Sequence, residues 1–389
     1  RCKRSPRGAG HIRRRPPSSR PRASSSARAS PEGLRVPASF TNNRQIPRTS
    51  VYRPPRRTRA MGGVDEAAMT PLELMRHRNG LMHSESSVAN GRGFVPRPTD
   101  VFVVTYPKCG TTWATQICHQ IRCVRAARDD PSMDAMAFGE ITQVVPWDIL
   151  ALDCDQDLDA DHVCDPRVFK SHERWEDVAK GAKYLCVVRN PIDVFYSFYN
   201  FLPAYMGIEP GAIAPEEFAD AIFAGASHSG HCWQHFLGYL DARDGDEGKG
   251  EGKGEKIMMI CFEDLKEDLP RCVRAIASFM GFDDMTPREI DRVVHASGFE
   301  FMRANATSFD DHFVRRKMWA RCGIPESDWR GGGVGKVRDG GGVVGGGALG
   351  MSEALRRRID GKWEEVMRPR GFATYDDFRA AVNEVNTRY

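Results

Sequence analysis

One segment of the chain combines an apolar run, a short polar loop and a helical pattern. The apolar run Val101–Val104 is typical of a buried strand, the loop YPKCGTTW covers Tyr106–Trp113, and the helical pattern runs from Ala114 to Arg122. A loop between a strand and a helix presents backbone N–H groups at the helix N-terminus, where the helix dipole favours negative charge. The segment therefore predicts an anion-binding site.

The order of residues in this loop separates it from a nucleoside-triphosphate loop. That motif reads G-x-x-x-x-G-K-[ST], with its lysine after the glycines. Here Lys108 precedes Gly110, and the loop has no earlier glycine. Gly110 lets the backbone approach an anion closely, Lys108 adds a point charge, and Thr111 and Thr112 can cap the helix and donate hydroxyls. The loop indicates phosphate chemistry other than ATP hydrolysis.

Strands and helices alternate from about residue 98 onward. We expect strands at 101–106, 167–171, 184–188 and 257–262, and helices at 112–127, 191–205, 265–280 and 287–295. Continuous apolar strands separated by helices are typical of a parallel sheet that is buried on both faces. The predicted fold class is therefore α/β, with a mostly parallel central sheet and helices on both faces.

The charge of the chain is divided unevenly. The first 60 residues hold 17 Lys and Arg and one acid, Glu32, whereas the remainder holds 39 basic and 51 acidic residues. The acidic body argues against a nucleic-acid partner. We expect residues 1–60, which are rich in Arg, Ser and Pro, to be a disordered leader. It is a non-native leader before Met61, an organelle transit peptide or, least favoured, a nucleic-acid-binding tail.

Cysteine usage and hydropathy bear on the compartment. The eleven cysteines form no C-x-x-C pair, and Cys186 and Cys261 stand inside apolar runs. This pattern is typical of buried, reduced thiols in a reducing compartment. No apolar run approaches the roughly 20 residues of a membrane span, so we expect no membrane partner. We expect a cytoplasmic protein, or a plastid or other organelle protein if residues 1–60 are a transit peptide.

A second cluster, Phe169-Lys170-Ser171-His172, stands at the end of a predicted strand. Ligands of open parallel sheets bind beyond the carboxyl ends of the strands, so Lys108, Lys170 and His172 should meet at one edge. A histidine between two lysines has a depressed pKa and stays neutral, which suits a general base. The alternative interpretation is a surface histidine that happens to follow a strand.

A third cluster follows the strand at 184–188. Arg189 ends this strand just before a helix, and Ser197 lies roughly two turns into that helix. Arg189 can grip a phosphate with two hydrogen bonds, and Ser197 can add a hydroxyl. The alternative is a helix-capping arginine and a packing serine. Asp193, in the first turn of the helix, is interpreted as a partner of the helix dipole.

Together the three clusters resemble the cytosolic sulfotransferase family. The matching pieces are TYPKCGTTW at 105–113, FKSH at 169–172 and VVRNPIDVFYSFYNF at 187–201. The resemblance extends over about residues 98–380. It implies a single three-layer α/β domain with a P-loop-like loop, and 3′-phosphoadenosine 5′-phosphosulfate (PAPS) as co-substrate without a metal. We place this domain at 98–389, after an N-terminal lead-in at 61–97 and with a low-complexity insertion at 244–256.

The resemblance also implies a role for each matching residue. His172 would take the acceptor's proton, Lys108 would neutralise charge on the bridging oxygen, and Lys170 would assist the sulfuryl group. The remaining contacts are to the nucleotide: Lys108, Cys109, Gly110, Thr111, Thr112 and Trp113 at the 5′-phosphosulfate, and Arg189 and Ser197 at the 3′-phosphate. Such a transfer depends mainly on positioning and charge stabilisation, which these residue types supply.

Two later segments resemble nucleotide-binding parts of the family. The segment 293–302 resembles its adenine-side segment, which adds Ser297, Phe299 and Met302 to the site. The late R-K-G-x-x-G-D-W loop has two candidates, 330–335 and 338–345. We prefer the second, because the helix through Trp363 then follows at nearly the family distance, so Arg338 and Gly340 are expected at the 3′-phosphate. A flexible Gly-rich linker is the alternative for either stretch.

The chain departs from the family pattern at several positions. Cys109 replaces the usual Ser, and a thiol is a weaker donor and is oxidisable. Phe262 replaces a Tyr, and Asp339 replaces a Lys. The family's dimer segment has no match at Gly345–Leu349, so we expect a monomer or an atypical dimer.

A few aromatic residues indicate what kind of acceptor the chain binds, and two histidines raise the possibility of a metal site. Trp147 and Phe201 match acceptor-lining positions and suit an apolar or aromatic small molecule, although both are also ordinary core residues. His231 and His235 have helical metal-ligand spacing, but no third ligand is evident, so we expect no metal.

The sequence thus predicts a sulfotransferase that acts on a hydroxyl or amine of a small molecule. One alternative is a nucleotide-binding protein without turnover, in view of the departures at Cys109, Phe262 and Asp339. The other is a small-molecule kinase, which the missing G-x-x-x-x-G-K-[ST] disfavours.

Overall fold

The structure is a computed structural model that describes residues 65–225, 228–245, 256–324, 335–337 and 344–386. All that follows concerns the unit Val64–Tyr389. Arg338 and Gly340 of the predicted phosphate loop, and residues 330–334 of its rival, lie outside the described residues.

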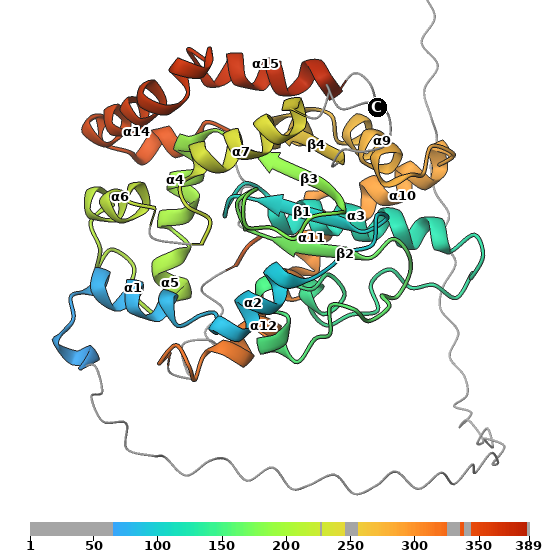
Figure 1. The fold of residues 1–389 in the computed structure, drawn as a ribbon, viewed down its shortest axis with the longest axis horizontal. Helices are drawn as coiled ribbons and strands as arrows, with labels where there is room; N and C mark the ends of the chain where they lie inside the picture. Colours follow the sequence, from blue (N-terminus) through green and yellow to red (C-terminus); the bar gives the residue numbers. More distant parts are fainter. Residues whose placement is uncertain (1–64, 226–227, 246–255, 325–334, 338–343, 387–389) are drawn as a thin grey trace, which may run out of the picture. The chain divides into compact units, whose positions relative to one another are not determined.

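Four parallel strands form the sheet in the order β2-β1-β3-β4 (Figure 1). Their bounds are β1 Val101–Thr105, β2 Val168–Ser171, β3 Lys183–Val188 and β4 Lys256–Cys261. Val104 pairs with Ser171, and Thr105 pairs with Val187, so the carboxyl ends of three strands meet at one edge of the sheet. The predicted α/β fold with a parallel sheet is confirmed.

Alternate residues of the strands enter two separate hydrophobic clusters, which gives three layers. Phe102 and Val104 of β1 face the helices α4 Pro191–Tyr199, α7 Cys232–Gly245, α14 Glu353–Val366 and α15 Tyr375–Asn386. Val101 and Val103 face α3 Thr111–Ala126, α9 Leu269–Met280 and α10 Pro287–Ala296. The remaining helices are α1 Pro71–Gly80, α2 Glu85–Gly93, α5 Leu202–Tyr205, α6 Pro215–Phe223, α8 Phe262–Glu267, α11 Phe299–Ala304 and α12 His312–Met318. The short 3-10 helices η2 Ile141–Gln143, η3 Asp148–Leu150 and η6 Gly346–Gly350 lie between them.

Two long helices of the prediction are wrong, since each is divided in two. The expected helix 191–205 breaks between α4 and α5, where Pro203 has no N–H to donate back along the helix. The expected helix 265–280 is α8 followed by α9, whose first turn contains a proline and is capped by the Asp268 side chain on the Arg271 N–H. Phe262, expected at the end of a strand, begins α8.

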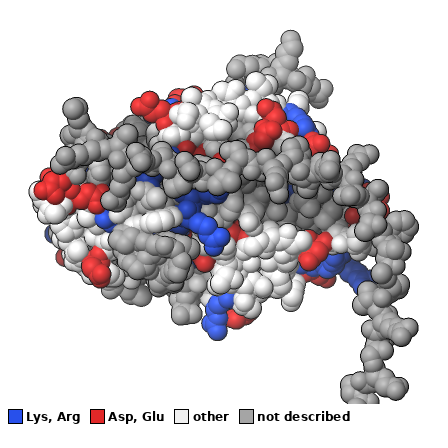
Figure 2. All heavy atoms as spheres, turned by 90° about the horizontal axis from the view of Figure 1, so that it is seen from below, with Lys and Arg blue, Asp and Glu red and all other residues white. Residues whose placement is uncertain are grey.

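The surface and the thiols follow the composition. On the face shown in Figure 2, basic side chains stand in separate groups among acidic ones. In the part of the chain that the structure describes, no helix combines the length and apolar character that crossing a bilayer requires. The ten described cysteines are free thiols, and all but Cys164 are buried.

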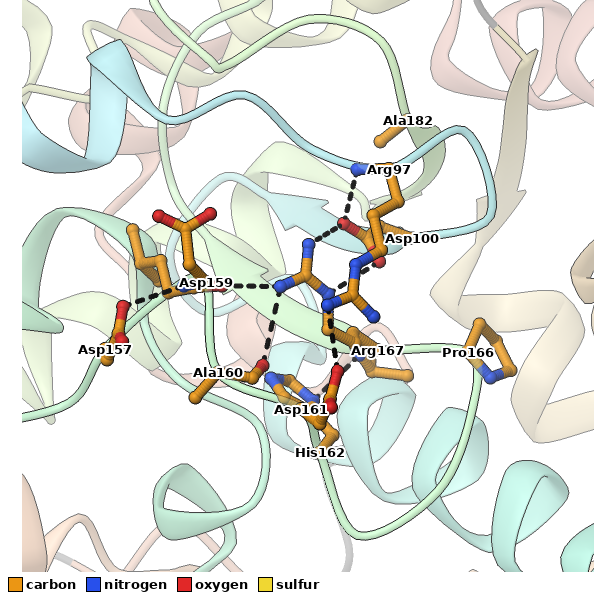
Figure 3. A network of polar contacts seen from close by, with 12 residues as sticks. Arg97, Asp100, Asp157, Asp159, Ala160, Asp161, His162, Pro166, Arg167 and Ala182 are labelled. Carbon is orange, nitrogen blue, oxygen red and sulfur yellow. Dashed lines mark hydrogen bonds and ion pairs between the residues drawn. The ribbon is translucent and has the colours of Figure 1, made fainter.

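A buried ion pair joins the amino ends of β1 and β2 (Figure 3). Arg167 donates to both carboxylate oxygens of Asp100, at 2.9 and 2.5 Å, and no more than 1% of either side chain is exposed. Arg167 also donates to the Leu158 carbonyl at 2.8 Å, and the Arg97 backbone N–H donates to Asp100 at 2.7 Å. The pair fixes the register of the two strands whose other ends carry the predicted catalytic residues.

Candidate active site

A cavity of about 280 Å³ opens at the carboxyl edge of the sheet. It is lined by fourteen of the residues predicted from the sequence: Lys108, Gly110, Thr111, Thr112, Trp113, Trp147, Lys170, His172, Arg189, Ser197, Phe201, Ser297, Phe299 and Met302. These residues come from the ends of three strands and from segments as far apart as 147 and 302. The structure therefore brings the separately predicted site residues together in one cavity. Of the predicted residues that the structure describes, Cys109 alone is not part of the lining.

The loop after β1 turns through two left-handed residues. Lys108 has φ 74° and Gly110 has φ 105°. A Cβ on Gly110 would lie 2.8 Å from the Phe262 ring, so both the conformation and the close approach require glycine there. The Nζ of Lys108 lies 3.5 Å above the ring centre of Phe201. The lysine charge is thus held against an aromatic wall of the cavity.

The predicted threonine cap of α3 is wrong. The N-cap residue is Gly110, and no side chain caps the helix. The Thr111 hydroxyl instead shares a hydrogen bond of 2.5 Å with the hydroxyl of Thr105. The first backbone N–H groups of α3 consequently have no side-chain acceptor, which is the condition for binding an anion at a helix N-terminus.

Cys109 differs from expectation in the same loop. Its side chain is fully buried in the hydrophobic cluster that also contains Tyr106. Burial raises the pKa of the Cys109 thiol well above its ordinary value. The predicted oxidisable thiol in the anion site is therefore wrong, because the left-handed turn at Lys108 directs the next side chain into the core. Only the backbone of Cys109 is available to the loop's function.

His172, just after β2, is held in one tautomer. Its Nδ1 donates to the Thr105 carbonyl at 2.7 Å, which leaves Nε2 as the acceptor of a neutral ring. Trp147 meets the imidazole edge-on, with ring centres 4.9 Å apart. Burial, and then the charge of Lys170, lower the pKa of His172 well below its ordinary value. The ring is therefore a neutral base at physiological pH.

Lys170 lies beside this histidine and is nearly inaccessible, with 5% of the residue exposed. Its Nζ stands 3.7 Å above the Trp147 ring and 3.9 Å from Oδ1 of Asp311. The Lys170 backbone N–H donates to the Pro146 carbonyl at 2.8 Å, so the segment with Trp147 runs along β2. Burial lowers the pKa of Lys170 to about 8, and Asp311 opposes this change.

Arg189 connects the cavity to the third cluster. Its guanidinium lies 4.2 Å from the ring centre of Phe262 and donates to the Lys108 carbonyl at 3.4 Å. It also pairs with Asp193 at 3.7 Å, while its buried Nε has no hydrogen-bond partner among the described residues. The carboxylate of Asp193 accepts from the backbone N–H groups of Gly345 and Gly347, both at 2.9 Å. Asp193 thus anchors the segment after the Gly-rich stretch, a role beyond that of a dipole partner.

The far side of the cavity is built around Trp113. Its indole N–H donates to the Ser297 carbonyl at 2.7 Å, and its ring meets Phe262 edge-on at 5.6 Å. The Ser297 hydroxyl is buried, and no described residue forms a hydrogen bond with it. Phe299 and Met302 complete this wall. A flat polar-edged group would find aromatic contacts and one buried hydroxyl here.

Several cavity residues were missed from the sequence. Asp311, immediately before α12, and Lys336 contribute a carboxylate and an amine, and Lys336 pairs with Asp311. Met75, Asn79 and His83, from the lead-in, form part of the opposite wall. No local pattern marks any of these residues, because each reaches the cavity from a segment without a recognisable motif.

The candidate metal ligands lie elsewhere. His235 is fully buried and packs against the rings of Tyr106 and Tyr239, with ring centres 6.1 and 5.0 Å away. His231 lies against Trp233. Within the described ranges, no group of three or more His, Cys, Asp or Glu side chains is placed to hold a metal ion. His235 belongs to the aromatic core.

Comparison with known proteins identifies related chains. The family described as "Sulfotransferase domain" matches residues 98–326. Human sulfotransferase 1E1 is 26% identical over 266 residues, covering 62% of this chain and 80% of the relative. Mouse sulfotransferase 2B1 is 30% identical over 251 residues, covering 60% and 66%. Flavonol 3-sulfotransferase of Flaveria bidentis is 25% identical over 263 residues, covering 63% and 80%.

Solved structures share the fold. Mouse sulfotransferase SULT7A1, complexed with PAP, superposes with a TM-score of 0.51 at 19% identity, over 79% of this chain and 95% of that one. Retinol dehydratase in a complex with retinol and PAP gives 0.52 at 18% identity, over 76% and 93%.

Proposed function

Because the chain belongs to the sulfotransferase family, we propose that it transfers a sulfuryl group from PAPS to a hydroxyl or amine of a small molecule. The observation that carries this proposal is the placement of one neutral base, His172, beside two lysines in a single cavity. A positioned base typically contributes about 10²–10⁴-fold to such a transfer. The solved relatives that share the fold were crystallised with PAP, which favours the same class of nucleotide here.

The residues present fit such a donor. Two buried polar atoms of cavity-lining residues, Arg189 Nε and Ser297 Oγ, have no hydrogen-bond partner in the described part of the chain and suit a phosphate and an adenine edge. When bound, PAPS supplies a sulfuryl group attached to a phosphate leaving group. Lys108 and the free N–H groups of α3 would hold the 5′ end, and Arg189 and Ser197 would hold the 3′-phosphate.

The chain's own residues then divide the work of transfer. His172 would accept the acceptor's proton at Nε2, because Nδ1 is committed to the Thr105 carbonyl. Lys108 and Lys170 would stabilise the negative charge that develops during transfer, in a cavity where burial strengthens their effect. Apolar walls from Met75, Phe201 and other residues would exclude water from the reacting groups.

The same walls favour an apolar acceptor. Trp147, Ile149, Phe198, Phe201 and Leu202 all line the cavity. Structures with retinol and with androsterone are known for the retinol dehydratase relative, and both ligands are largely apolar. We therefore propose a small apolar or aromatic molecule with one nucleophilic hydroxyl or amine. The domain is proposed to span 98–389 and to act in the cytoplasm.

The test is transfer of ³⁵S from labelled PAPS to a panel of phenols, aliphatic alcohols and amines. Wild type should label at least one acceptor, and His172→Ala should reduce the rate by 100-fold or more. His231→Ala is the matched control, since His231 is half-buried but lies outside the cavity lining. Adenosine 3′,5′-bisphosphate should bind both variants with wild-type affinity.

Two results would contradict the proposed reaction, and a third would contradict the role of His172. Binding of adenosine 3′,5′-bisphosphate without transfer to any acceptor would favour a nucleotide-binding protein without turnover. Consumption of ATP without sulfate transfer would favour a kinase. Transfer that persists in His172→Ala would leave the reaction standing and remove the role of His172 as base.

A further inference from the structure

A buried charge cluster adjoins the reacting end of the cavity. Asp311 lies between Lys170, whose Nζ is 3.9 Å from Oδ1, and Lys336, whose Nζ contacts Oδ2. Only 3% of Asp311 is exposed. Asp311 also has a left-handed backbone with φ 61°, which is uncommon for a residue other than glycine. Strain of this kind persists only where surrounding structure holds it, and such positions concentrate at functional sites.

We propose that Asp311 is a positioning residue for the transfer step: its carboxylate keeps the ammonium group of Lys170 charged and holds that of Lys336 beside it at the reacting end of the cavity. The inference rests on the proposed function and assigns a role to two residues outside the sequence motifs. Lys336 would be a third cation beside Lys108 and Lys170. Since both lysines share one carboxylate, the cluster keeps a net positive charge toward a bound anion.

The charged and titratable groups around Lys170 single out Asp311. They are Asp311, Lys336, Glu140 and Asp148, with His172 on the same strand end and His83 opposite. Burial raises the pKa of Glu140 and of Asp148 to about 7, so neither is a dependable anion at neutral pH. Burial would also raise the pKa of Asp311, but Lys170 and Lys336 outweigh it and lower that pKa. Asp311 is the described carboxylate near Lys170 that stays ionised.

The two neighbours of Lys170 therefore act in opposite directions. Asp311 raises the pKa of Lys170, whereas Lys336 lowers it. With burial holding that pKa at about 8, loss of the carboxylate would leave Lys170 neutral near pH 7. A neutral amine cannot stabilise the charge on a transferring sulfuryl group. The role of Asp311 is therefore to keep the Lys170 amine protonated.

The test compares pH profiles of kcat/KM for PAPS in Asp311→Asn, Lys336→Met and the wild type. The alkaline limb should move to lower pH by at least one unit in Asp311→Asn and to higher pH in Lys336→Met. At pH 7 the rate of Asp311→Asn should fall about tenfold or more. Affinity for adenosine 3′,5′-bisphosphate, which has no sulfuryl group, should change less than threefold. Asp310→Asn is the matched control, since this neighbouring carboxylate is partly exposed and pairs with His312.

Opposite shifts distinguish this role from a structural one, which would move both profiles together or neither. A wild-type profile in Asp311→Asn would overturn the inference while leaving the proposed function intact. Absence of transfer in the wild type would overturn the proposed function. NMR titration of lysines labelled with ¹³C at Cε then still tests the charge relation, because Lys170 should titrate at lower pH in Asp311→Asn. If that variant does not fold, the shift in Lys336→Met decides, and an unchanged or lowered limb there would refute the inference.

Discussion

Replacement of Arg167 by methionine should strongly destabilise the protein without altering the cavity. The substitution keeps the volume of the side chain but removes two hydrogen bonds to the Asp100 carboxylate, at 2.9 and 2.5 Å. It also leaves the Leu158 carbonyl without its partner at 2.8 Å. Asp100 is fully buried, and of its described hydrogen-bond donors the Arg97 backbone N–H alone would remain (Figure 3).

The expected cost follows from this geometry. Removing one partner of a buried ion pair leaves an uncompensated charge and costs about 3–5 kcal/mol. Against a typical domain stability of about 5–15 kcal/mol, the loss is large. The matched control is Arg97→Met, because Arg97 pairs with Asp161 through side chains that are 45% and 85% exposed. Such surface pairs contribute about 0–1 kcal/mol.

Urea unfolding followed by tryptophan fluorescence measures both costs, and the slope of the transition should stay unchanged. The double variant Asp100→Asn, Arg167→Met should lose less stability than the sum of its single variants, since the amide removes the orphaned charge. The affinity for adenosine 3′,5′-bisphosphate at low temperature should match the wild type, because the pair lies at the opposite ends of the strands from the cavity. A cost for Arg167→Met no greater than that of Arg97→Met would refute this reasoning.

Three further predictions concern other sites. Gly110→Ala should weaken binding of adenosine 3′,5′-bisphosphate about tenfold, as measured by calorimetry. The φ of Gly110 is 105°, and an added Cβ would lie 2.8 Å from a carbon of the Phe262 ring. The control Gly361→Ala should bind normally, because nothing lies within 4 Å of its added Cβ. Burial lowers the pKa of His235 to about 3, whereas the ring binds a proton near pH 6.5 once the chain unfolds. The free energy of unfolding should therefore fall as the pH decreases from 6.5 towards 3. Between pH 7 and pH 5 the wild type should lose about 2 kcal/mol more of this free energy than His235→Phe. Among the ten described cysteines, iodoacetamide should modify Cys164 first, because a hydrogen bond from a neighbouring thiol lowers its pKa. It should modify Cys109 only after unfolding, as mass spectrometry of peptides would show.

The sheet could be predicted from the sequence because its strands are continuous apolar runs. A strand that is buried on both faces is apolar at every position, so the ends of the apolar run mark the ends of the strand. The predicted bounds of β1 and β3 accordingly lie within one residue of the observed ones. Parallel pairing then placed Lys108, Lys170 and His172 at one edge without any further information. The cavity contains all three, which follows from the order of the strands and not from the loops between them.

Side-chain direction inside the loops could not be predicted in the same way. Whether residue 109 faces the anion site or the core depends on the left-handed φ of Lys108, and a lysine gives no sign of that conformation in a sequence. The same limit applies to Thr111, whose hydroxyl was expected at the helix N-terminus and instead meets Thr105. Residue type predicts what a loop can bind, whereas backbone conformation decides which of its atoms are available.

Charge clusters resist prediction for a different reason. Asp311, Lys336 and Lys170 come from three distant segments. In a polar stretch, an acid or a lysine is normally predicted to be exposed to solvent. The Gly-rich stretches predict a phosphate contact through their arginines, because arginine binds phosphate with two parallel hydrogen bonds. Lys336, which precedes the second stretch by two residues, has instead become part of the reacting end of the cavity. Because burial is what turns these three charges into a cluster, and burial depends on the whole fold, the role of Asp311 could be inferred only once the cavity was known.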